Sequence, residues 1–473
     1  MNIITLLLPI LIPVLAGAFL LIRRPDRSET ISLLVAIVTG VTLLGVPGYR
    51  FELAFSDTLS FLLEPDGFSM FFTVIMVTAF ACAILYSREY LAGDERRPIF
   101  FGFTLLTLGA LMGLSLAGNI VTFYFFFECM SILSFPLVLY NGGEKARSAA
   151  MCYLGFSVFG ASLALMGMLM GGTITLVPFA APVEAMELPL NLQWAWLLMA
   201  LGFSCKAGMM PLANWLPTAH PVAPAPASAL LSGIITKAGI LGMLRSTFHL
   251  FGAENLAGSF AQTVMLTLAI VTIFTGSMLA YKEKLLKKRL AYSSVSQLSY
   301  VIFGLMLLTP AGLEGGLMQV LFHACAKVGL FLCAGAFIHH AEANYVDELV
   351  GIGRKMPGVL TAFACFSLSL VGLPPFGGLV SKDLLVAAAQ GQGCKLAQLG
   401  IVVLLISALL TAGYLLPIVA RGFFPGADCK IKKHDAGWPM LVPLFVLAAV
   451  AVVLGLWPEP VAHFLHGAMA GLF

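Results

Sequence analysis

The sequence predicts an all-α integral membrane protein with about fourteen transmembrane helices. Of its 473 residues, 60% are hydrophobic and only 10% are charged, against roughly 25% charged residues in an ordinary soluble domain. Apolar runs of about 18 residues or more, each long enough to cross a hydrocarbon core of roughly 30 Å, recur along the whole chain. No stretch remains from which a separate soluble domain could be built.

The apolar runs also locate the individual spans. The first run lacks a basic segment before it and is followed by Arg23 and Arg24, so we expect a retained helix rather than a cleaved signal peptide. We expect the spans to begin near Ile3, Ile31, Phe68, Ile99, Ile120, Ala149, Leu192, Ala227, Ala261, Leu290, Gly315, Gly358, Leu399 and Trp438.

The distribution of basic residues predicts the orientation. Of the 26 Lys and Arg residues, 19 fall in connections after odd-numbered spans, and three, Arg50, Arg245 and Lys395, fall on the other side. Because basic loops face the cytoplasm, we expect both termini to lie outside. The 19 residues are Arg23, Arg24, Arg27, Arg88, Arg96, Arg97, Lys145, Arg147, Lys282, Lys284, Lys287, Lys288, Arg289, Arg354, Lys355, Arg421, Lys430, Lys432 and Lys433.

Four basic side chains remain, and all of them lie within predicted spans: Lys206, Lys237, Lys327 and Lys382. A lysine at the centre of a spanning helix costs roughly 2.5 to 3.5 kcal/mol, so each of them needs compensation. Snorkelling toward the interface explains a single lysine near a helix end, but it fits four of them poorly. We therefore interpret these lysines as candidate proton-carrying residues.

Glu128 offers an opposite charge inside the membrane, because apolar or weakly polar residues flank it on both sides. A lysine near such an acid, with Lys206 as the candidate, can load and release a proton when the acid moves or is neutralised. The alternative is a static ion pair that only holds helices together.

His323 and Lys327 lie four residues apart and therefore share one helix face. A neutral imidazole can both accept and donate a proton, so this pair suits a proton relay. Haem ligation is the alternative, but we find no second centrally placed histidine to complete a bis-histidine site. The nine cysteines are scattered and include no CxxC pair, so we expect no metal site.

Proline interrupts two predicted spans, each time near a lysine. Pro211 follows Lys206, whereas Pro374 and Pro375 precede Lys382. A proline inside a helix removes one backbone hydrogen bond, and open backbone at membrane depth needs cover from protein or water. We therefore expect a hydrated cavity at each break.

The interrupted spans are the seventh and the twelfth, which predicts two five-helix repeats, spans 4–8 and 9–13. The lysine precedes the break in one repeat and follows it in the other, a reversal that suits inverted topology. We expect the proline-rich segment HPVAPAPAS, residues 220–228, to be a stiff cytoplasmic loop. The expected divisions are residues 1–98 for the first three helices, 99–250 and 251–425 for the repeats, and 426–473 for the last helix.

Four segments carry a family resemblance, in the order KAGMMPLANWLPTAHPVAPAPASALLSGIITKAGILGMLR, KKRLAYSSVSQLSYV, FHACAKVGLFLCAG and GLPPFGGLVSKD. Together they resemble the antiporter-like proton-translocating subunits of respiratory complex I. Relatives of those subunits occur in energy-converting membrane-bound hydrogenases, including hydrogenase-4 and formate hydrogenlyase types, and in Mrp-type sodium/proton antiporters. The resemblance covers residues 65–425.

The resemblance implies a role for each buried ionisable residue. In this family such residues form a hydrated axis along the membrane midplane, in which proton transfer is driven by electrostatic coupling to a neighbouring subunit. Placed on matching positions of this sequence, the axis runs from Glu128 and Lys206 through Lys237, then His323 and Lys327, to Lys382.

The sequence differs from some members of this family in two respects. The last residue of the axis is Lys382, whereas some family members have a glutamate there. The chain also stops shortly after the fourteenth span, so we expect it to lack the long lateral helix of the largest antiporter-like subunit. The motif HPxAPxPxSALLSG is most similar to that of the hydrogenase and Mrp relatives.

We therefore expect a proton-translocating subunit of a redox-driven complex of the complex I or hydrogenase type. The sequence has no Rossmann glycine fingerprint, Fe–S cysteine pattern or flavin motif, so partner subunits would carry any Fe–S cluster, flavin or nickel–iron centre. The alternative is a subunit of an Mrp-type sodium/proton antiporter without electron transfer. An independent solute carrier is disfavoured, because no substrate-sized polar constellation exists beyond the charge axis.

The expected partners are other membrane subunits, including neighbouring antiporter-like ones, and the expected ions are protons and, in the alternative, sodium. No basic patch interleaved with aromatic residues suggests nucleic acid binding. By resemblance, the membrane is a bacterial or archaeal plasma membrane.

Overall fold

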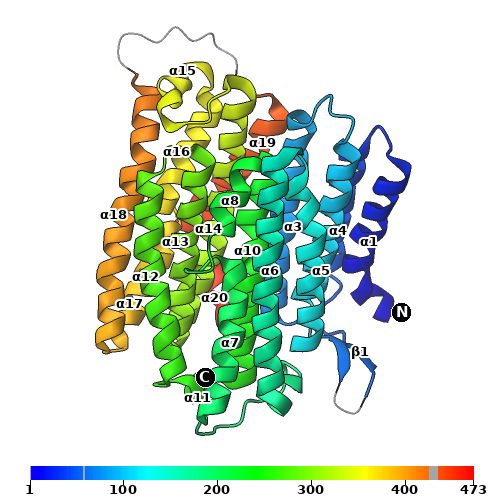
Figure 1. Ribbon diagram of the computed structural model, residues 1–473, viewed down its shortest axis with the longest axis vertical. Coiled ribbons are helices and arrows are strands. Elements are labelled where there is room, and N and C mark those ends of the chain that lie inside the picture. The colour runs from blue at the N-terminus through cyan, green and yellow to red at the C-terminus, as the bar shows by residue number, and fades with distance from the viewer. Residues whose placement is uncertain (1, 57–58, 426–434) are drawn as a thin grey trace.

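The structure is a computed structural model that describes residues 2–56, 59–425 and 435–473. Most of these residues lie in helices that run side by side along the long axis of the molecule (Figure 1). One end carries a hairpin and the short helix α11 (Ala253–Leu256), and the opposite end carries α15 (Ile352–Lys355) (Figure 1). The expected cytoplasmic Lys430, Lys432 and Lys433 lie outside the described residues.

The chain forms its elements in the following order. The first half contains α1 (Asn2–Arg23), α2 (Ser28–Leu43), β1 (Phe51–Ala54), β2 (Ser60–Leu63), α3 (Gly67–Tyr90), α4 (Arg97–Ser115), α5 (Ile120–Leu139), α6 (Gly143–Gly171), the 3₁₀ helix η1 (Gly172–Leu176), α7 (Leu190–Ala207), α8 (Trp215–Val222), α9 (Ala225–Leu230), the π-helix η2 (Leu231–Ile235), α10 (Thr236–Leu244), the π-helix η3 (Arg245–Phe251) and α11. The second half contains α12 (Phe260–Lys282), α13 (Leu286–Met306), α14 (Pro310–Ala341), the 3₁₀ helix η4 (Val346–Leu349), α15, α16 (Pro357–Val371), α17 (Gly378–Gly391), α18 (Lys395–Phe423), α19 (Trp438–Leu456) and α20 (Glu459–Met469).

Within the described residues, ten helices are long and apolar enough to cross a membrane. Helices satisfy their backbone hydrogen bonds internally, which is what a segment in lipid requires. The apolar helices α2 and α16 are shorter, with 16 and 15 residues. The chain is therefore a multi-pass membrane protein.

The structure adds one element that the purely helical prediction does not include. Strands β1 and β2 form an antiparallel hairpin of four residues each. The hairpin is anchored on α5, because Leu62 N donates to Thr122 Oγ1 at 2.8 Å and Asn119 Nδ2 donates to Ser60 O at 2.9 Å. Strands this short have too few residues for an alternating pattern to stand out in the sequence.

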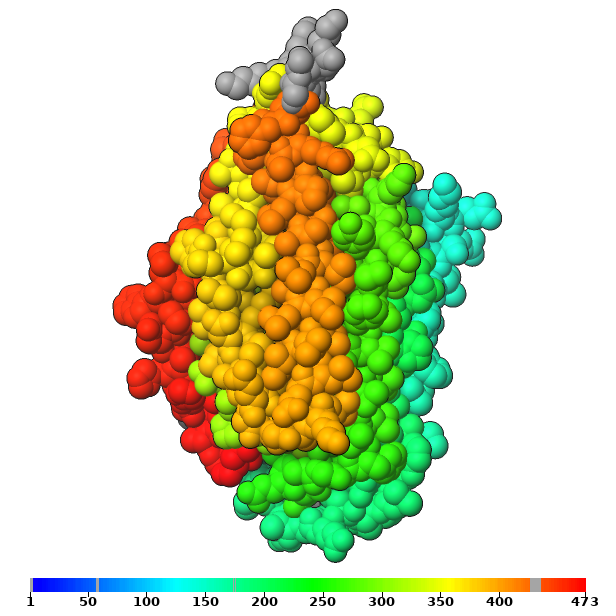
Figure 2. Space-filling model, turned by 90° about the vertical axis from the view of Figure 1, so that its left-hand side faces the viewer, coloured from blue at the N-terminus to red at the C-terminus, as the bar shows by residue number. Residues whose placement is uncertain are grey.

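Two central helices are shielded by the others. The continuous helix 225–251, made of α9, η2, α10 and η3, is 100% buried over its most apolar window, and α14 is 94% buried. The corresponding value is 39% for α18, which lies across one face of the molecule as the orange ridge in Figure 2. The two spans that carry Lys237, Arg245 and Lys327 are therefore kept away from lipid by the surrounding helices.

Both interrupted helices end at a glycine in the left-handed conformation. Gly208 has a φ of +81° directly after α7, and Gly372 has a φ of +90° directly after α16. Glycine adopts this conformation without steric cost and closes the last helical turn. Pro211 lies between α7 and α8, and Pro374 and Pro375 lie between α16 and α17. The chain resumes a helix after each gap.

The prediction of an extended cytoplasmic loop at residues 220–228 is wrong. His220 and Pro221 belong to α8, and α9 begins at Ala225, with the segment around it buried in the molecule. Proline is tolerated in the first turn of a helix, where its missing N–H has no partner to lose, and Pro226 occupies that turn. The prolines therefore start the central helix 225–251 instead of keeping the chain extended.

Candidate functional site

Lys206 is buried at the end of α7, inside a cage of hydroxyl groups. Its Nζ donates to Ser131 Oγ at 3.0 Å, to Tyr153 OH at 2.8 Å and to Ser157 Oγ at 2.9 Å. The ammonium also lies 4.3 Å from the centre of the Tyr153 ring, within cation–π range. Three acceptors match the three donors of an ammonium group, so the buried charge is fully hydrogen-bonded.

Glu128 is half-buried on α5 and does not touch Lys206. Among the residues that the structure describes, no ion pair within 4.0 Å joins the two side chains, although they interact electrostatically. Ser131, which accepts from Lys206, lies three residues after Glu128 and therefore on the same helix face. A static salt bridge does not hold these helices together.

Lys237 is held on the central helix directly after the π-helix η2. Its Nζ donates to Ser232 O at 2.8 Å and lies 2.8 Å from His323 Nδ1 on α14. A charged ammonium can only donate, so a neutral His323 accepts at Nδ1 and carries its hydrogen on Nε2. That Nε2 has no hydrogen-bond partner in the described part of the chain. One π turn placed beside a buried charge is a common feature of functional sites.

Close helix packing brings the first two lysines near each other. A Cβ added at Gly239 on α10 would lie 2.3 Å from Phe203 O and 3.1 Å from Lys206 Cβ on α7. Only glycine allows the two backbones to approach so closely. Lys206 and Lys237 therefore stand on helices in direct contact.

Lys327 is fully buried one turn after His323, and its Nζ donates to Leu290 O on α13 at 3.0 Å. The sequence reasoning placed both residues on one helix face, and the structure has them there on α14. A backbone carbonyl, rather than a carboxylate, is the partner of this buried charge.

Lys382 lies near the start of α17 and reaches back across the break to the end of α16. Its Nζ donates to Leu370 O at 2.5 Å and to Val371 O at 2.7 Å. The last carbonyls of a helix have no partners in the helix and carry the negative end of its dipole. The interruption thus creates the acceptor site for the lysine.

Amide and hydroxyl side chains that the sequence reasoning did not select lie beside Lys382. Gln319 Nε2 donates to Gln297 Oε1 at 2.8 Å, and Ser381 Oγ donates to Gln319 Oε1 at 2.6 Å. Gln319 lies four residues before His323, so the same spacing that paired His323 with Lys327 could have identified it. These three side chains lead from α13 through α14 to the residue next to Lys382.

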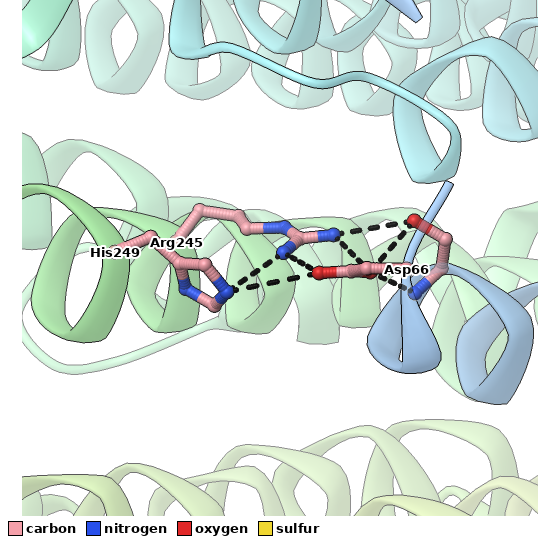
Figure 3. A network of polar contacts seen from close by, with 4 residues as sticks. Asp66, Arg245 and His249 are labelled. Atoms are coloured by element: carbon pink, nitrogen blue, oxygen red, sulfur yellow. Dashed lines mark hydrogen bonds and ion pairs between the residues drawn. The ribbon is translucent and has the colours of Figure 1, made fainter. Parts of the chain in front are cut away.

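A second charged cluster was missed because Arg245 was assigned to a loop outside the membrane. In the structure Arg245 is 1% exposed in η3, inside helix 225–251. Its Nη1 and Nη2 donate to the two Asp66 oxygens at 2.5 and 2.7 Å, and Nη1 lies 3.0 Å from His249 Nε2 (Figure 3). Lys287 and Arg289 were also expected in a loop and are likewise buried, with Lys287 Nζ donating to Ala223 O at 2.8 Å.

Asp66 lies in the short connection between the β1–β2 hairpin and α3. It is the N-cap of that helix, where its Oδ1 accepts from Ser69 N at 2.8 Å. Burial alone would raise the pKa of the Asp66 carboxyl, but the Arg245 guanidinium outweighs this effect and holds the pKa well below its usual value of 3.8. Asp66 is therefore ionised at every physiological pH.

Comparison with known proteins relates the chain to one family of membrane proteins. The family of NADH:quinone oxidoreductase/Mrp antiporter transmembrane proteins matches residues 117–411. The chain is 31% identical to NADH-quinone oxidoreductase subunit N of Desulforudis audaxviator, over 82% of this chain and 80% of that protein. It is 26% identical to one of the subunits of the Na(+)/H(+) antiporter of Alkalihalophilus pseudofirmus, over 97% of this chain and 95% of that protein.

A solved structure gives the same fold. A chain of respiratory complex I from Thermus thermophilus with bound NADH superposes with a TM-score of 0.85 at 25% identity, covering 99% of each chain. The match extends from the first helices to the last ones, well beyond the part that the family pattern covers. The chain belongs to the NADH:quinone oxidoreductase/Mrp antiporter transmembrane family, as an antiporter-like membrane subunit.

Proposed function

We propose that this protein translocates protons along a row of buried ionisable residues as one subunit of a multisubunit membrane complex. The observation that carries the proposal is the direct contact between Lys237 and His323 at 2.8 Å in the most enclosed part of the molecule. An ammonium and a neutral imidazole at hydrogen-bond distance can exchange one proton without moving either helix. The row consists of Glu128, Lys206, Lys237, His323, Lys327 and Lys382.

Hydrogen bonding of the four lysines supports transport rather than structural pairing. Each ammonium is held by hydroxyl, imidazole or backbone acceptors, and within the described residues no carboxylate lies within 4.0 Å of any of them. A lysine locked to a carboxylate would keep its proton, whereas neutral acceptors hold the ammonium without fixing its charge. Glu128, near Lys206 but not bonded to it, is placed to bias that lysine when its own charge changes.

The helices are proposed to form fourteen spans. To the ten long apolar helices we add α2, α13, α7 with α8, and α16 with α17. The first five-helix repeat then runs from α4 to η3 and the second from α12 to α18. Lys206 ends the first part of an interrupted helix and Lys382 begins the second part of the other, which is the reversal expected of inverted repeats.

The complex is proposed to be redox-driven, of the complex I or hydrogenase type, with Fe–S clusters, flavin or nickel–iron on partner subunits. Relatives named as NADH-quinone oxidoreductase subunits support this choice. A second candidate is an Mrp-type sodium/proton antiporter, favoured by the match over 97% of the chain to an Na(+)/H(+) antiporter subunit. In both cases the neighbours are other membrane subunits of a bacterial or archaeal plasma membrane.

The relay is tested with Lys206→Ala and Glu128→Ala in the assembled complex. Proton uptake into membrane vesicles should fall at least tenfold in both variants, while a native gel shows a complex of unchanged size. Lys145→Ala, at an exposed position of α6, is the matched control and should pump normally. Near-normal uptake by both test variants would refute the relay.

A second experiment distinguishes the redox-driven complex from the antiporter. The tagged protein is purified gently from its native host, and its stoichiometric partners are identified by mass spectrometry. Partners with Fe–S or nickel-binding sequences establish a redox-driven pump. A set made only of membrane-embedded partners establishes the antiporter.

A further inference from the structure

An apolar groove of about 650 Å³ lies between α3, α14, α19 and α20. Its walls include Val74 of α3, Cys325 of α14, Val450 of α19 and Phe464 of α20. Among the described residues that line the groove, only Thr78 has a polar side-chain oxygen. A cavity with apolar walls stays dry, so the groove suits an apolar occupant.

The groove occupies one half of the membrane depth. On α3 its lining residues run from Met70 to Ala79, in the part of the helix that follows Gly67. On α14 they lie at positions 321–325, near the middle of that helix. Pro47, in the connection before the β1–β2 hairpin, lines the groove at the hairpin end of the molecule. The groove therefore runs from one membrane surface to about the bilayer centre, which is the depth of one leaflet.

The rim of the groove continues into the lipid-facing surface of the protein. Val74 is 57% exposed and Phe464 is 44% exposed, and both line the groove. Val453, next to the lining residue Leu454 on α19, is 55% exposed. Because lipid tails are as apolar as these side chains, the bilayer reaches the groove without a polar barrier.

The size of the groove distinguishes an acyl chain from a helix of a partner subunit. A helix with its side chains is roughly 10–12 Å across, so over half of the hydrocarbon core, roughly 15 Å, it would fill roughly 1,200 Å³. The groove has about half of that volume. A partner helix can therefore lie over the groove but cannot enter it fully, whereas a hydrocarbon chain without side groups is narrow enough to do so.

We propose that this groove binds an acyl chain of a phospholipid in the leaflet at the hairpin end, which is the outer leaflet in the predicted orientation. The inference goes beyond the proposed function and does not depend on it. Entering the groove from the bilayer brings the chain no hydrophobic gain, because lipid is apolar too. Van der Waals contacts with the walls on several sides hold the chain in place.

The bound chain packs against the rear of the helix that carries two of the buried ionisable residues. Leu321, Ala324 and Cys325 of α14 line the groove. Because successive residues of a helix are rotated by about 100°, these three lie on the side of α14 that is turned away from His323 and Lys327. The acyl chain covers this side, which α3, α19 and α20 leave open to the bilayer.

The direct test is photolabelling of the whole complex after purification and thorough washing in detergent. Phe464 is replaced by p-benzoylphenylalanine, which keeps the phenyl ring and reacts with nearby C–H bonds on irradiation. The peptide that contains position 464 should gain the mass of a phospholipid. The same replacement at Phe274 of α12, which is 41% exposed and does not line the groove, should give no phospholipid adduct.

Three results of the labelling would overturn the proposal. They are an adduct of detergent alone at position 464, a cross-link from position 464 to another subunit, and phospholipid adducts of equal yield at positions 464 and 274. The second result would show that a partner subunit covers the groove, and the third that the lipid is not specific to it.

A second test fills the groove with a side chain. In Val74→Trp the indole takes the place of the acyl chain, so native mass spectrometry of the washed complex should show one phospholipid fewer per chain than in wild type. Val271→Trp, at a 47% exposed valine of α12, should retain the wild-type number. Equal numbers in all three proteins would contradict the proposal. The labelling experiment leaves Val74 unchanged, so poor assembly of Val74→Trp does not prevent a decision, and neither readout involves proton movement.

Discussion

At the scale of single residues, the protein solvates buried lysines with neutral groups. The hydroxyl cage of Lys206, the imidazole beside Lys237 and the carbonyls at Lys327 and Lys382 each replace water without supplying a full negative charge. Hydrogen bonds to charged groups contribute roughly 1.5–3 kcal/mol each, enough to offset a large part of the cost of burial. The proton can then be exchanged without breaking an ion pair.

Tyr153→Phe tests the cage of Lys206. The substitution keeps the ring but removes one of three acceptors, so proton translocation should fall by about threefold to tenfold, less than in Lys206→Ala. Uptake of protons into vesicles measures the effect. Tyr281→Phe, at an exposed position of α12, is the control, and equal rates in wild type and Tyr153→Phe would contradict the role of the cage.

Asp66→Asn tests the Asp66–Arg245 pair. Removing one partner of a buried pair typically costs about 3–5 kcal/mol, and the partial exposure of Asp66 places this case at or below the lower end. We expect a lower unfolding temperature for the purified protein in detergent. Glu52→Gln, which breaks the exposed pair with Arg50, should leave that temperature unchanged.

The pH dependence of the same pair has a definite sign. Because the folded-state pKa of Asp66 is depressed, its contribution to stability is complete above the ordinary pKa of 3.8 and disappears only as the pH falls through the lower folded value. The difference in unfolding temperature between wild type and Asp66→Asn should therefore be constant from about pH 5 to pH 8. A difference that vanishes at pH 5 would show that the pair does not hold the pKa down.

The sequence identified the buried lysines because four lysines remain within predicted spans after the other basic residues are assigned to connections. It missed Arg245, because the count treated every basic residue near a span end as a loop residue. The partners of Lys206 could not be foreseen either, since Tyr153 and Ser157 are contributed by a helix whose rotation depends on packing. Whether Glu128 and the lysines carry protons remains a prediction.

At the scale of elements, breaks and π turns place these side chains. The gap after α7 requires a glycine at position 208, and a Cβ there would lie 2.1 Å from Leu216 Cδ1 at the start of α8. A left-handed conformation costs a non-glycine residue about 1–2 kcal/mol in addition. The connection between the two halves of this interrupted helix therefore favours glycine at this position.

Gly208→Ala tests the requirement for glycine in the gap between α7 and α8. The backbone strain at a φ of +81°, together with the shift that the Leu216 side chain has to make, should lower both the unfolding temperature and proton translocation. Gly155→Ala is a matched control in α6, because an added Cβ there meets no atom within 4 Å. Equal stability of the two variants would show that the gap tolerates a side chain.

Sequence reasoning was weakest for elements that contain proline. Residues 220–228 were interpreted as a loop because their composition matches an extended linker, yet burial against the neighbouring helices turns the segment into helix. The breaks after α7 and α16 involve prolines too, and there a glycine in the left-handed conformation separates the two helical parts. Proline alone does not distinguish a helix start from a helix break.

At the scale of the whole molecule, the helices divide into an outer layer and an enclosed centre. Apolar helices such as α18 form the outer surface (Figure 2), and the helices that carry Lys237 and Lys327 lie in the centre. The long apolar runs made the ten strongest spans predictable. Helix α13 is harder to assign from hydropathy, because its serines and glutamine serve internal hydrogen bonds.

The predicted orientation is tested with a membrane-impermeant maleimide on intact cells. Cys394, at the exposed start of α18, should be labelled from outside in wild-type protein. In a Cys394→Ser, Cys429→Ser background, Lys145→Cys should be labelled only after the cells are permeabilised. Labelling of Lys145→Cys in intact cells would reverse the assignment of inside and outside.

Biogenesis of this chain has to keep its central polar helices away from lipid until their partners exist. Helix 225–251 is synthesised with Lys237 exposed, and His323, which contacts that lysine, follows 86 residues later. During that interval the lysine would cost roughly 2.5 to 3.5 kcal/mol in the bilayer. The insertion machinery must therefore shelter an unfinished half of the protein and release it only when α14 arrives to close around it.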